Sequence, residues 1–237
     1  MASKSKLMAE LIAADGTVDV ANTDITGTII GSQIADGAVS SAKLDATYLT
    51  PTGDGSGLSG IAGGFSNMQV FTSPGTWTNP GSVTKVKVTV VGGGSAGAKP
   101  VGSAFGPGGG AGGAAIEVVT IPTSPVPITR GAGGTGNGGA GGTSSFGAYC
   151  SATGGGPGQP NGSGSGGTIN FNGGSGSVAG GDSNGSGMGG SSIFGGAGTD
   201  GTNPPTRDAK AYGSGGAGGN GSYPSGTGYP GVVAVEW

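Results

Sequence analysis

The acidic side chains are the residues of this chain that come closest to a catalytic set. The 237 residues include 12 Asp plus Glu and no His, so the commonest general base and the commonest zinc ligand are both missing. Between Glu117 and Glu236 the acids are Asp182, Asp200 and Asp208. Two converging carboxylates can hydrolyse a glycosidic bond, but the spacing of these three gives no sign of convergence. We predict that the chain is not an enzyme and has no catalytic or metal site.

Two other features resemble reactive motifs but lack the surroundings that the chemistry requires. Val90–Gly97 has the glycine spacing of a dinucleotide-binding turn, yet the following sequence, which contains Pro100, cannot start the helix that such a turn needs. Cys150 is the one cysteine, so no disulfide can form within a chain. We expect Cys150 to pack as a small buried apolar residue, and we expect no cofactor.

Binding is better supported than catalysis. Aromatic rings beside amide groups suit both sugars and protein loops, although such rings can also pack between glycine segments. Residues 199–211 are the most polar and least glycine-rich part of the late sequence, and we predict an exposed loop with solvated charges there. The candidate receptor contacts are Asn170, Phe171, Asn172, Arg207, Asp208, Lys210 and Tyr212.

The elements that must position these residues are rich in glycine. Of the 62 glycines, 50 lie after residue 90, many of them three apart. Glycine is unfavourable in helices and ordinary strands, whereas polyproline II has three residues per turn and no internal hydrogen bonds. We predict a bundle of polyglycine II helices bonded to one another; a flexible linker is the alternative. The triplet sets are Gly106, Gly109 and Gly112; Gly133, Gly136, Gly139 and Gly142; and Gly213, Gly216 and Gly219.

Short apolar runs predict a β-frame that carries this bundle. We expect strands at 68–71, 82–91, 114–120 and 232–237, with pairing resumed at 128–129, because apolar residues alternate with polar ones or form short runs there. Residues 73–77 read as a turn. Pro122, Pro125 and Pro127 predict an edge position or an irregular turn.

The first part of the chain has a different pattern. Leu7, Met8, Leu11 and Ile12 would form one stripe on a short helix. Between residues 18 and 49 aliphatic residues recur every four or five positions, which predicts short extended pieces in a trimeric shaft; a monomeric loop region is the alternative. We therefore expect a mainly β protein with an N-terminal attachment segment (1–17), a shaft and hinge (18–66) and a glycine-rich distal domain (67–237).

Charge and hydropathy narrow the partners. The net charge is −3, with nine Lys plus Arg, which gives no basic stripe for nucleic acid. The N-terminal apolar run is too short for a signal peptide, and no run reaches the ~20 residues of a membrane span. We expect synthesis in a reducing cytoplasm, followed by assembly into a particle.

Several segments together resemble the glycine-rich C-terminal domain of bacteriophage tail-fibre proteins. They are Phe71–Thr78, Val86–Gly94, Thr143–Gly147 and Gly231–Trp237. The similarity spans residues 68–237, and Ile25–Leu44 resembles phage shaft sequence. The glycine-rich region also resembles the tip adhesins of T-even phages. This chain differs from them because it carries its own N-terminal section and lacks a long assembly domain.

The resemblance implies a virion fibre. Its N-terminus would dock on the phage tail or baseplate, its shaft would be a homotrimer, and its distal loops would bind a glycan or outer-membrane protein of the host. A tailspike that depolymerises host polysaccharide and a capsid decoration fibre without a receptor are the alternatives.

Overall fold

The described part of the chain is one compact unit. The computed structural model describes residues 65–237 except 82, 101–104, 121–124, 180–184 and 200–203. By its internal contacts the chain divides into two units, Met1–Ile61 and Ala62–Trp237. The predicted N-terminal helix and shaft, with their domain boundary, lie outside the described residues.

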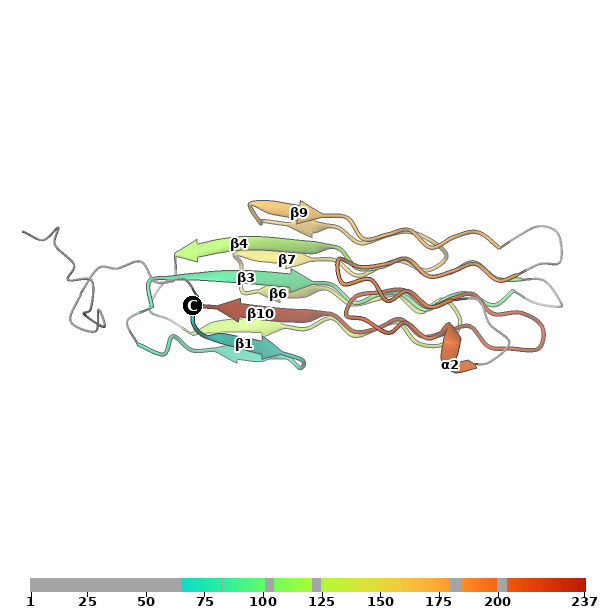
Figure 1. The fold of residues 1–237 in the computed structure, drawn as a ribbon, viewed down its shortest axis with the longest axis horizontal. Coiled ribbons are helices and arrows are strands. Elements are labelled where there is room, and N and C mark those ends of the chain that lie inside the picture. Colours follow the sequence, from blue (N-terminus) through green and yellow to red (C-terminus); the bar gives the residue numbers. More distant parts are fainter. Residues whose placement is uncertain (1–64, 82, 101–104, 121–124, 180–184, 200–203) are drawn as a thin grey trace, which may run out of the picture. The chain divides into compact units, whose positions relative to one another are not determined.

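Two antiparallel five-stranded sheets face each other in this unit (Figure 1), which confirms the mainly β class. The first sheet has the order β1 (Met68–Phe71), β10 (Val232–Glu236), β3 (Lys85–Val91), β4 (Ala114–Thr120) and β9 (Ile169–Phe171). The second has the order β2 (Gly75–Trp77), β5 (Val126–Thr129), β6 (Ser144–Phe146), β7 (Cys150–Ala152) and β8 (Gly164–Ser165). A four-residue helix, α2 (Pro204–Arg207), lies outside both sheets.

The two sheets enclose a core of side chains, and we call this part the sandwich. Alternation in β3 points Val86, Val88 and Val90 inward and leaves Lys85 exposed, as the period of a half-buried strand requires. The Trp77 ring lies 6.1 Å from the rings of both Phe146 and Trp237. The core residues are Phe71, Trp77, Val86, Val88, Val90, Ala115, Val119, Val126, Ile128, Phe146, Cys150, Ala152, Val233 and Val235.

Most strand predictions are confirmed, but the turn predicted at 73–77 is partly wrong. Gly75–Trp77 is a strand that pairs with β5, with Thr76 opposite Pro127. Trp77 is fully buried, and the gain from removing so large a ring from water holds its segment in the sheet. The edge position or irregular turn predicted at Pro127 is also wrong, since β5 lies between β2 and β6. Pro127 is opposite Thr76, and its carbonyl accepts from the Gly147 amide at 2.8 Å.

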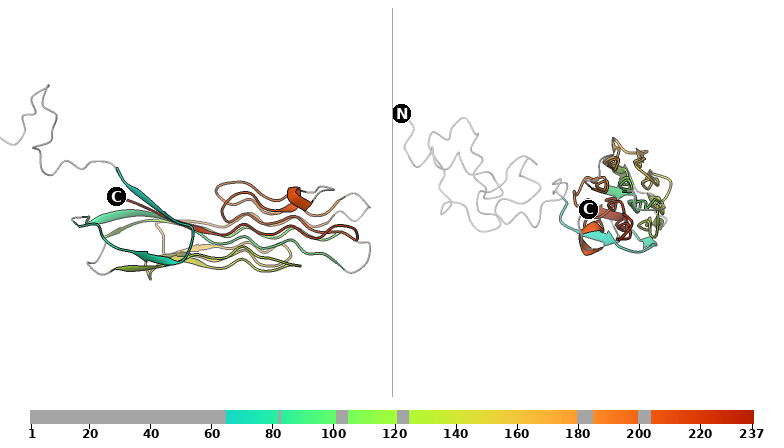
Figure 2. Two further views of the ribbon diagram at one scale, coloured as in Figure 1. Left: turned by 90° about the horizontal axis from the view of Figure 1, so that it is seen from below. Right: turned by 90° about the vertical axis from the view of Figure 1, so that its right-hand side faces the viewer.

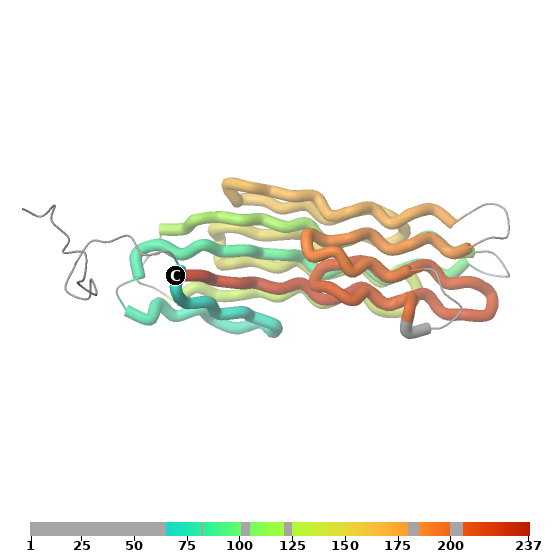
Figure 3. The backbone as a smooth tube through the Cα atoms, in the orientation of Figure 1, coloured from blue at the N-terminus to red at the C-terminus, as the bar shows by residue number. Residues whose placement is uncertain are grey.

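Beyond one end of the sandwich, the chain runs back and forth as wavy, roughly parallel segments (Figures 1 and 3). We call these segments the glycine bundle: the described parts of residues 92–113, 130–143, 153–163 and 172–231. Seen end-on, the segments stack side by side in several layers (Figure 2). The strands therefore continue into the bundle without a break in the chain's direction.

The central segment, Gly92–Ala98, shows how the bundle is held. Every N–H in it donates to another segment, and the partner changes with a period of three residues. Three other segments donate to its carbonyls, so it has six neighbours. This threefold alternation is the polyglycine II arrangement that the sequence predicts. The donor pairs are Gly92 to Gly113, Ser95 to Gly110, Ala98 to Pro107, Gly93 to Gly142, Ala96 to Gly139, Gly94 to Tyr229 and Gly97 to Gly226, at 2.8–3.0 Å.

Glycine is required in this segment because neighbouring backbone occupies the side-chain positions. A Cβ on Gly92, Gly93 or Gly94 would lie 2.2, 2.1 or 1.9 Å from a backbone oxygen of another segment. Ser95 is accommodated at a place where a neighbour ends: its hydroxyl donates to the Gly156 carbonyl at 2.7 Å, just before the turn at residues 157–159.

The triplet prediction is confirmed for two sets and wrong for the third. Gly106, Gly109 and Gly112 donate in register to Gly219, Gly216 and Gly213. The set from Gly133 to Gly142 does not form one helix. Gly136 and Gly138 have φ values of 68° and 72°, a left-handed turn that reverses the chain, so the set is divided between two antiparallel segments.

Candidate functional site: the bundle loops and the edge of the first sheet

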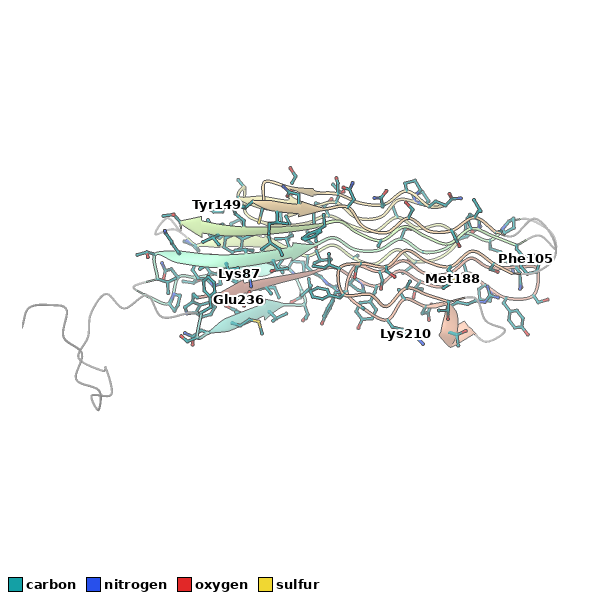
Figure 4. The ribbon with its side chains drawn as sticks, turned by 45° about the horizontal axis from the view of Figure 1, so that its top comes forward. Lys87, Phe105, Tyr149, Met188, Lys210 and Glu236 are labelled. Atoms are coloured by element: carbon teal, nitrogen blue, oxygen red, sulfur yellow. The ribbon has the colours of Figure 1, made fainter. Side chains whose placement is uncertain are left out.

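The described residues of the chain begin at one end of the unit, and the bundle segments reverse direction at the other. The described residues begin at the sandwich, where Ser66 and Asn67 donate to the Trp237 carbonyl at 3.0 and 2.9 Å. The described residues at the opposite end include Phe105 and the turn that follows Gly219. Figure 4 labels Phe105 at that far end and Glu236 at the sandwich. Whatever precedes residue 65 is therefore joined to the unit at the end remote from this turn.

The turn at Asn220–Tyr223 belongs to the far end. Gly219 donates to Ala98 and accepts from Gly106, so the turn follows the last hydrogen-bonded level of the central segment. The Asn220 side-chain oxygen accepts from the Ser222 and Tyr223 amides at 3.0 and 2.8 Å. Such a side-chain cap fixes the backbone of a turn without a regular element.

Arg207 corrects the prediction that the charges of residues 199–211 are solvated. Its side chain is only 1% exposed, and its guanidinium donates to the Ser186 hydroxyl at 3.0 Å and to the Gly218 carbonyl. The guanidinium also lies 5.7 Å from the centre of the Tyr223 ring. The planar fork of Arg can satisfy several acceptors at once, so one buried side chain serves acceptors from two different segments, Ser186 and Gly218.

The other candidates in this segment differ in exposure. The Asp208 carboxylate accepts from the Thr227 amide and hydroxyl at 2.7 and 2.9 Å. Lys210 is exposed, as predicted. Tyr212 is partly buried: it packs on the cluster of Val91, Ala114 and Val232, and its ring lies edge-on to Tyr229 at 5.4 Å.

The amide and aromatic candidates lie at the edge of the first sheet. Asn170 and Phe171 belong to β9 and are exposed, as is Asn172 after it. The Asn170 side chain bonds to the amide and carbonyl of Gly167, which holds the turn before β9. In Figure 1, β9 and α2 lie at opposite edges of the unit. The structure therefore does not bring the two groups of candidate residues together.

The described acids are engaged in structural contacts. Glu117 accepts from the Thr168 hydroxyl at 2.7 Å, and Glu236 pairs with Lys87 at 2.8 Å. Asp182 and Asp200 lie outside the described residues. Among the residues that are described, no cluster of three or more His, Cys, Asp or Glu side chains is placed to hold a metal ion.

Cys150 is buried in the sandwich, as predicted. Burial, and secondarily the negative charge of Glu117, raises the pKa of its thiol from 9.0 to about 11. A thiol that stays protonated at neutral pH is a poor nucleophile. The side chain therefore acts as packing.

Sequence reasoning missed two surfaces. One is a shallow hollow on the second sheet, of about 440 Å³, lined in part by Pro125, Pro127 and Tyr149. The other is the far end of the bundle. A signal for the far end was present, since the segment between β3 and β4 is longer than those between β5 and β6 or β7 and β8, and longer return segments reach further from the sheets.

Comparison with known proteins identifies the sequence family of the chain. A search of curated proteins returned no match. In the described part of the chain, no helix has the length and hydropathy needed to cross a bilayer. A family model described as "Glycine-rich domain" matches residues 66–231, a span that includes both the sandwich and the glycine bundle. The chain therefore belongs to the glycine-rich domain family.

Proposed function

We propose that this chain is a bacteriophage tail-fibre protein that is both structural and adhesive, and that it binds a receptor on the bacterial surface. One observation supports the proposal most: the chain joins the unit at the sandwich, while Phe105 and the Asn220–Tyr223 turn lie at the opposite end. A fibre tip needs this polarity, with attachment behind and recognition in front. The resemblance of residues 68–237 to phage fibre domains supports the same function.

The bundle suits adhesion because the Asn220–Tyr223 turn is held by its own hydrogen bonds before any ligand arrives. Each level of the central segment is bonded to neighbours in three directions. Loops on such a scaffold lose little conformational entropy on binding. Several copies on one particle would convert weak contacts with individual receptors into stable attachment.

The proposed contacts follow the exposure of the candidates. Asn170, Phe171, Asn172 and Lys210 present exposed side chains. Asp208 and Tyr212 are partly exposed and contribute an edge of polar and aromatic surface. Arg207 acts on the surface indirectly by holding the 207–212 segment against the bundle. We add the Asn220–Tyr223 turn to this set, because it lies at the far end.

The remaining partners follow from the fibre proposal. Residues 1–17 would dock on the phage tail or baseplate, and residues 18–66 would form the shaft of a homotrimer. The protein would be assembled in the host cytoplasm and become part of the virion, without binding nucleic acid. A bacterial glycan or an outer-membrane protein would be the receptor.

Adsorption of the full-length protein tests the proposal. Fluorescently labelled protein, applied to a panel of bacterial strains, should bind a subset of them. Ser222→Trp places bulk on the exposed far turn and should abolish binding. Ser73→Trp makes the same change at an exposed turn between β1 and β2 and should leave binding unchanged. Lys210→Glu and Phe171→Ser test the two lateral sites.

The outcomes separate the alternatives. Binding to no strain, or equal binding by the Ser222 and Ser73 variants, contradicts recognition by the far end. Release of new reducing ends from host polysaccharide would establish a depolymerase instead. Gold-labelled antibody on intact particles distinguishes a tail fibre from a capsid decoration fibre.

A further inference from the structure

The outer face of the first sheet, which points away from the sandwich core, carries two aligned rows of side chains. Strand register places five of them side by side, from Val70 through Thr89 to Ile169. The next row runs from Met68 to Val118. We call these two rows the outer face: Val70, Ala234, Thr89, Ile116 and Ile169 in the first row, and Met68, Glu236, Lys87 and Val118 in the second.

The outer face is apolar although it is open to solvent. Met68, Val70, Val118 and Ile169 are 64%, 44%, 51% and 49% exposed. An antiparallel sheet with one solvated face normally carries polar residues on that face. A contiguous apolar patch on a soluble domain marks an interaction site. The next row toward the bundle consists of Val232, Val91 and Ala114. Tyr212 packs on these residues and covers them.

The charges on the outer face neutralise each other. Lys87 and Glu236 occupy neighbouring strands and are joined at 2.8 Å (Figure 4). A pair that stays bonded can enter an interface without leaving one charge alone, although both groups lose water. Lys85 is exposed in the next row away from the bundle, so it lies at the margin of the outer face. Within its two rows, the face therefore suits an apolar partner of the same kind.

We propose that the outer face is where copies of this chain meet, three around one axis. Five strands spaced by ~4.8 Å make a face about 20 Å wide. If three such faces form the sides of a triangular prism, each sheet lies about 6 Å from the central axis. This distance is close to half of the ~10 Å that separates two packed sheets. Side chains from three copies would fill that space.

The position where the chain enters the sheet supports the same arrangement. Phe65, 48% exposed, precedes β1, which is an edge strand of this sheet. The 64 residues before it carry the proposed shaft, so copies joined there would start their sheets near one another. The face itself measures roughly 20 by 15 Å, which is small beside the ~800 Å² per partner of a stable interface. It would therefore close only when the shaft raises the local concentration.

This inference names the contact surface of the homotrimer in the proposed function and does not depend on receptor binding. Cysteine cross-linking of the full-length protein tests it. Val118→Cys places a thiol on the outer face, and Val178→Cys places one on the bundle, where Val178 is 67% exposed. Native Cys150 is buried and gives little background. Because each chain offers one accessible thiol, a short bis-maleimide should join the Val118→Cys protein into covalent dimers at least tenfold more efficiently than the Val178→Cys protein.

Mass in solution by light scattering completes the test and should correspond to three chains. Equal cross-linking of the two variants, or a trimer whose Val118→Cys thiol reacts singly without cross-links, overturns the proposal. A monomer or a dimer overturns it as well, including a monomer whose Val118→Cys thiol is protected by its own N-terminal residues. Adsorption is scored separately, so cross-linking without adsorption contradicts only the receptor function.

Discussion

The sandwich and the glycine bundle are both well packed, but different atoms do the packing. In the sandwich, buried rings and branched side chains fill the space between two sheets. In the bundle, backbone lies against backbone, and every N–H from Gly92 to Ala98 is paired with another segment. The sandwich even contains a buried donor, the Trp77 indole nitrogen, that has no hydrogen-bond partner among the described residues.

This difference teaches that the two regions should respond in opposite ways to a change in side-chain size. A side-chain core loses stability when atoms are removed, because a cavity remains. A backbone core loses stability when atoms are added, because the neighbouring backbone cannot rotate out of the way as a side chain can. The predictions below test this contrast, beginning with the largest effect.

Adding one methyl group to the central segment should be the most damaging change. The Cβ of Gly93→Ala would lie 2.1 Å from the Ala132 carbonyl oxygen, so two segments must separate and lose hydrogen bonds. We expect a loss of about 5 kcal/mol in the free energy of unfolding, at the upper end for a single substitution, measured by urea denaturation. Gly75→Ala is the control, since its Cβ would meet only the Phe71 ring, at 3.6 Å. Equal losses in the two variants would remove the contrast.

Removing a ring from the sandwich should be the next largest effect. Phe146 is fully buried against Trp77, and Phe146→Ala should cost about 4 kcal/mol. Phe194 follows Ser191–Ile193, a sequence similar to the Thr143–Ser145 that precedes Phe146. Phe194 is 52% exposed, so Phe194→Ala should change stability by less than about 1 kcal/mol. Thermal unfolding of the two variants compares them, and a larger loss for Phe194→Ala would contradict this placement of the core.

The buried Arg207 tests the one place where a large side chain enters the bundle. Lys cannot reproduce the forked contacts with the Ser186 hydroxyl and the Gly218 carbonyl, so Arg207→Lys should cost about 3 kcal/mol. Hydrogen exchange should rise at Gly218 and Ala217 and remain low in β3. Lys210→Ala, at the exposed neighbour, should leave both readouts unchanged. Unaltered exchange in Arg207→Lys would indicate that the segment is held by its backbone alone.

Alkaline pH should weaken the sandwich through Cys150. The folded thiol has a pKa of about 11 against an ordinary 9.0. Its contribution is therefore complete below about pH 9 and is lost as pH rises toward about 11, where the unfolded thiol has already ionised. The loss should reach about 2 kcal/mol by about pH 10.5. The difference in stability between wild type and Cys150→Ala, followed against pH, isolates this group from Tyr and Lys. A constant difference would contradict the pKa shift.

The sequence predicted the class and five of the ten strands, β1, β3, β4, β5 and β10, because each of these depends on a local pattern. Alternating valines define β3, and the run from Ala114 to Thr120 defines β4. Triplet glycines define the helix type. Strands β2, β6, β7, β8 and β9 and one reversal of the chain escaped prediction because they depend on distant contacts. The strand at Gly75–Trp77 forms around a buried Trp, and the reversal at Gly136–Gly138 uses glycines of the same spacing as a helix.

The candidate site was less predictable than the fold. Exposure of Lys210 followed from its polar surroundings. The burial of Arg207 did not, because its acceptors come from Ser186 and Gly218 on other segments. Composition shows that a segment is polar but not which carbonyls lie beside it. The separation of β9 from α2 likewise depends on strand order, which no local pattern reveals.

The threefold alternation of donors along Gly92–Ala98 restricts how this molecule can change length during evolution. Loss or gain of one residue within the segment would rotate all later amides by a third of a turn and aim each at the wrong neighbour. Length can therefore change in whole turns of three residues, with a matching change in the returning segment. Loops are free of this counting rule. Insertions and deletions should accumulate at the far turns, while the segments between them vary only in triplets.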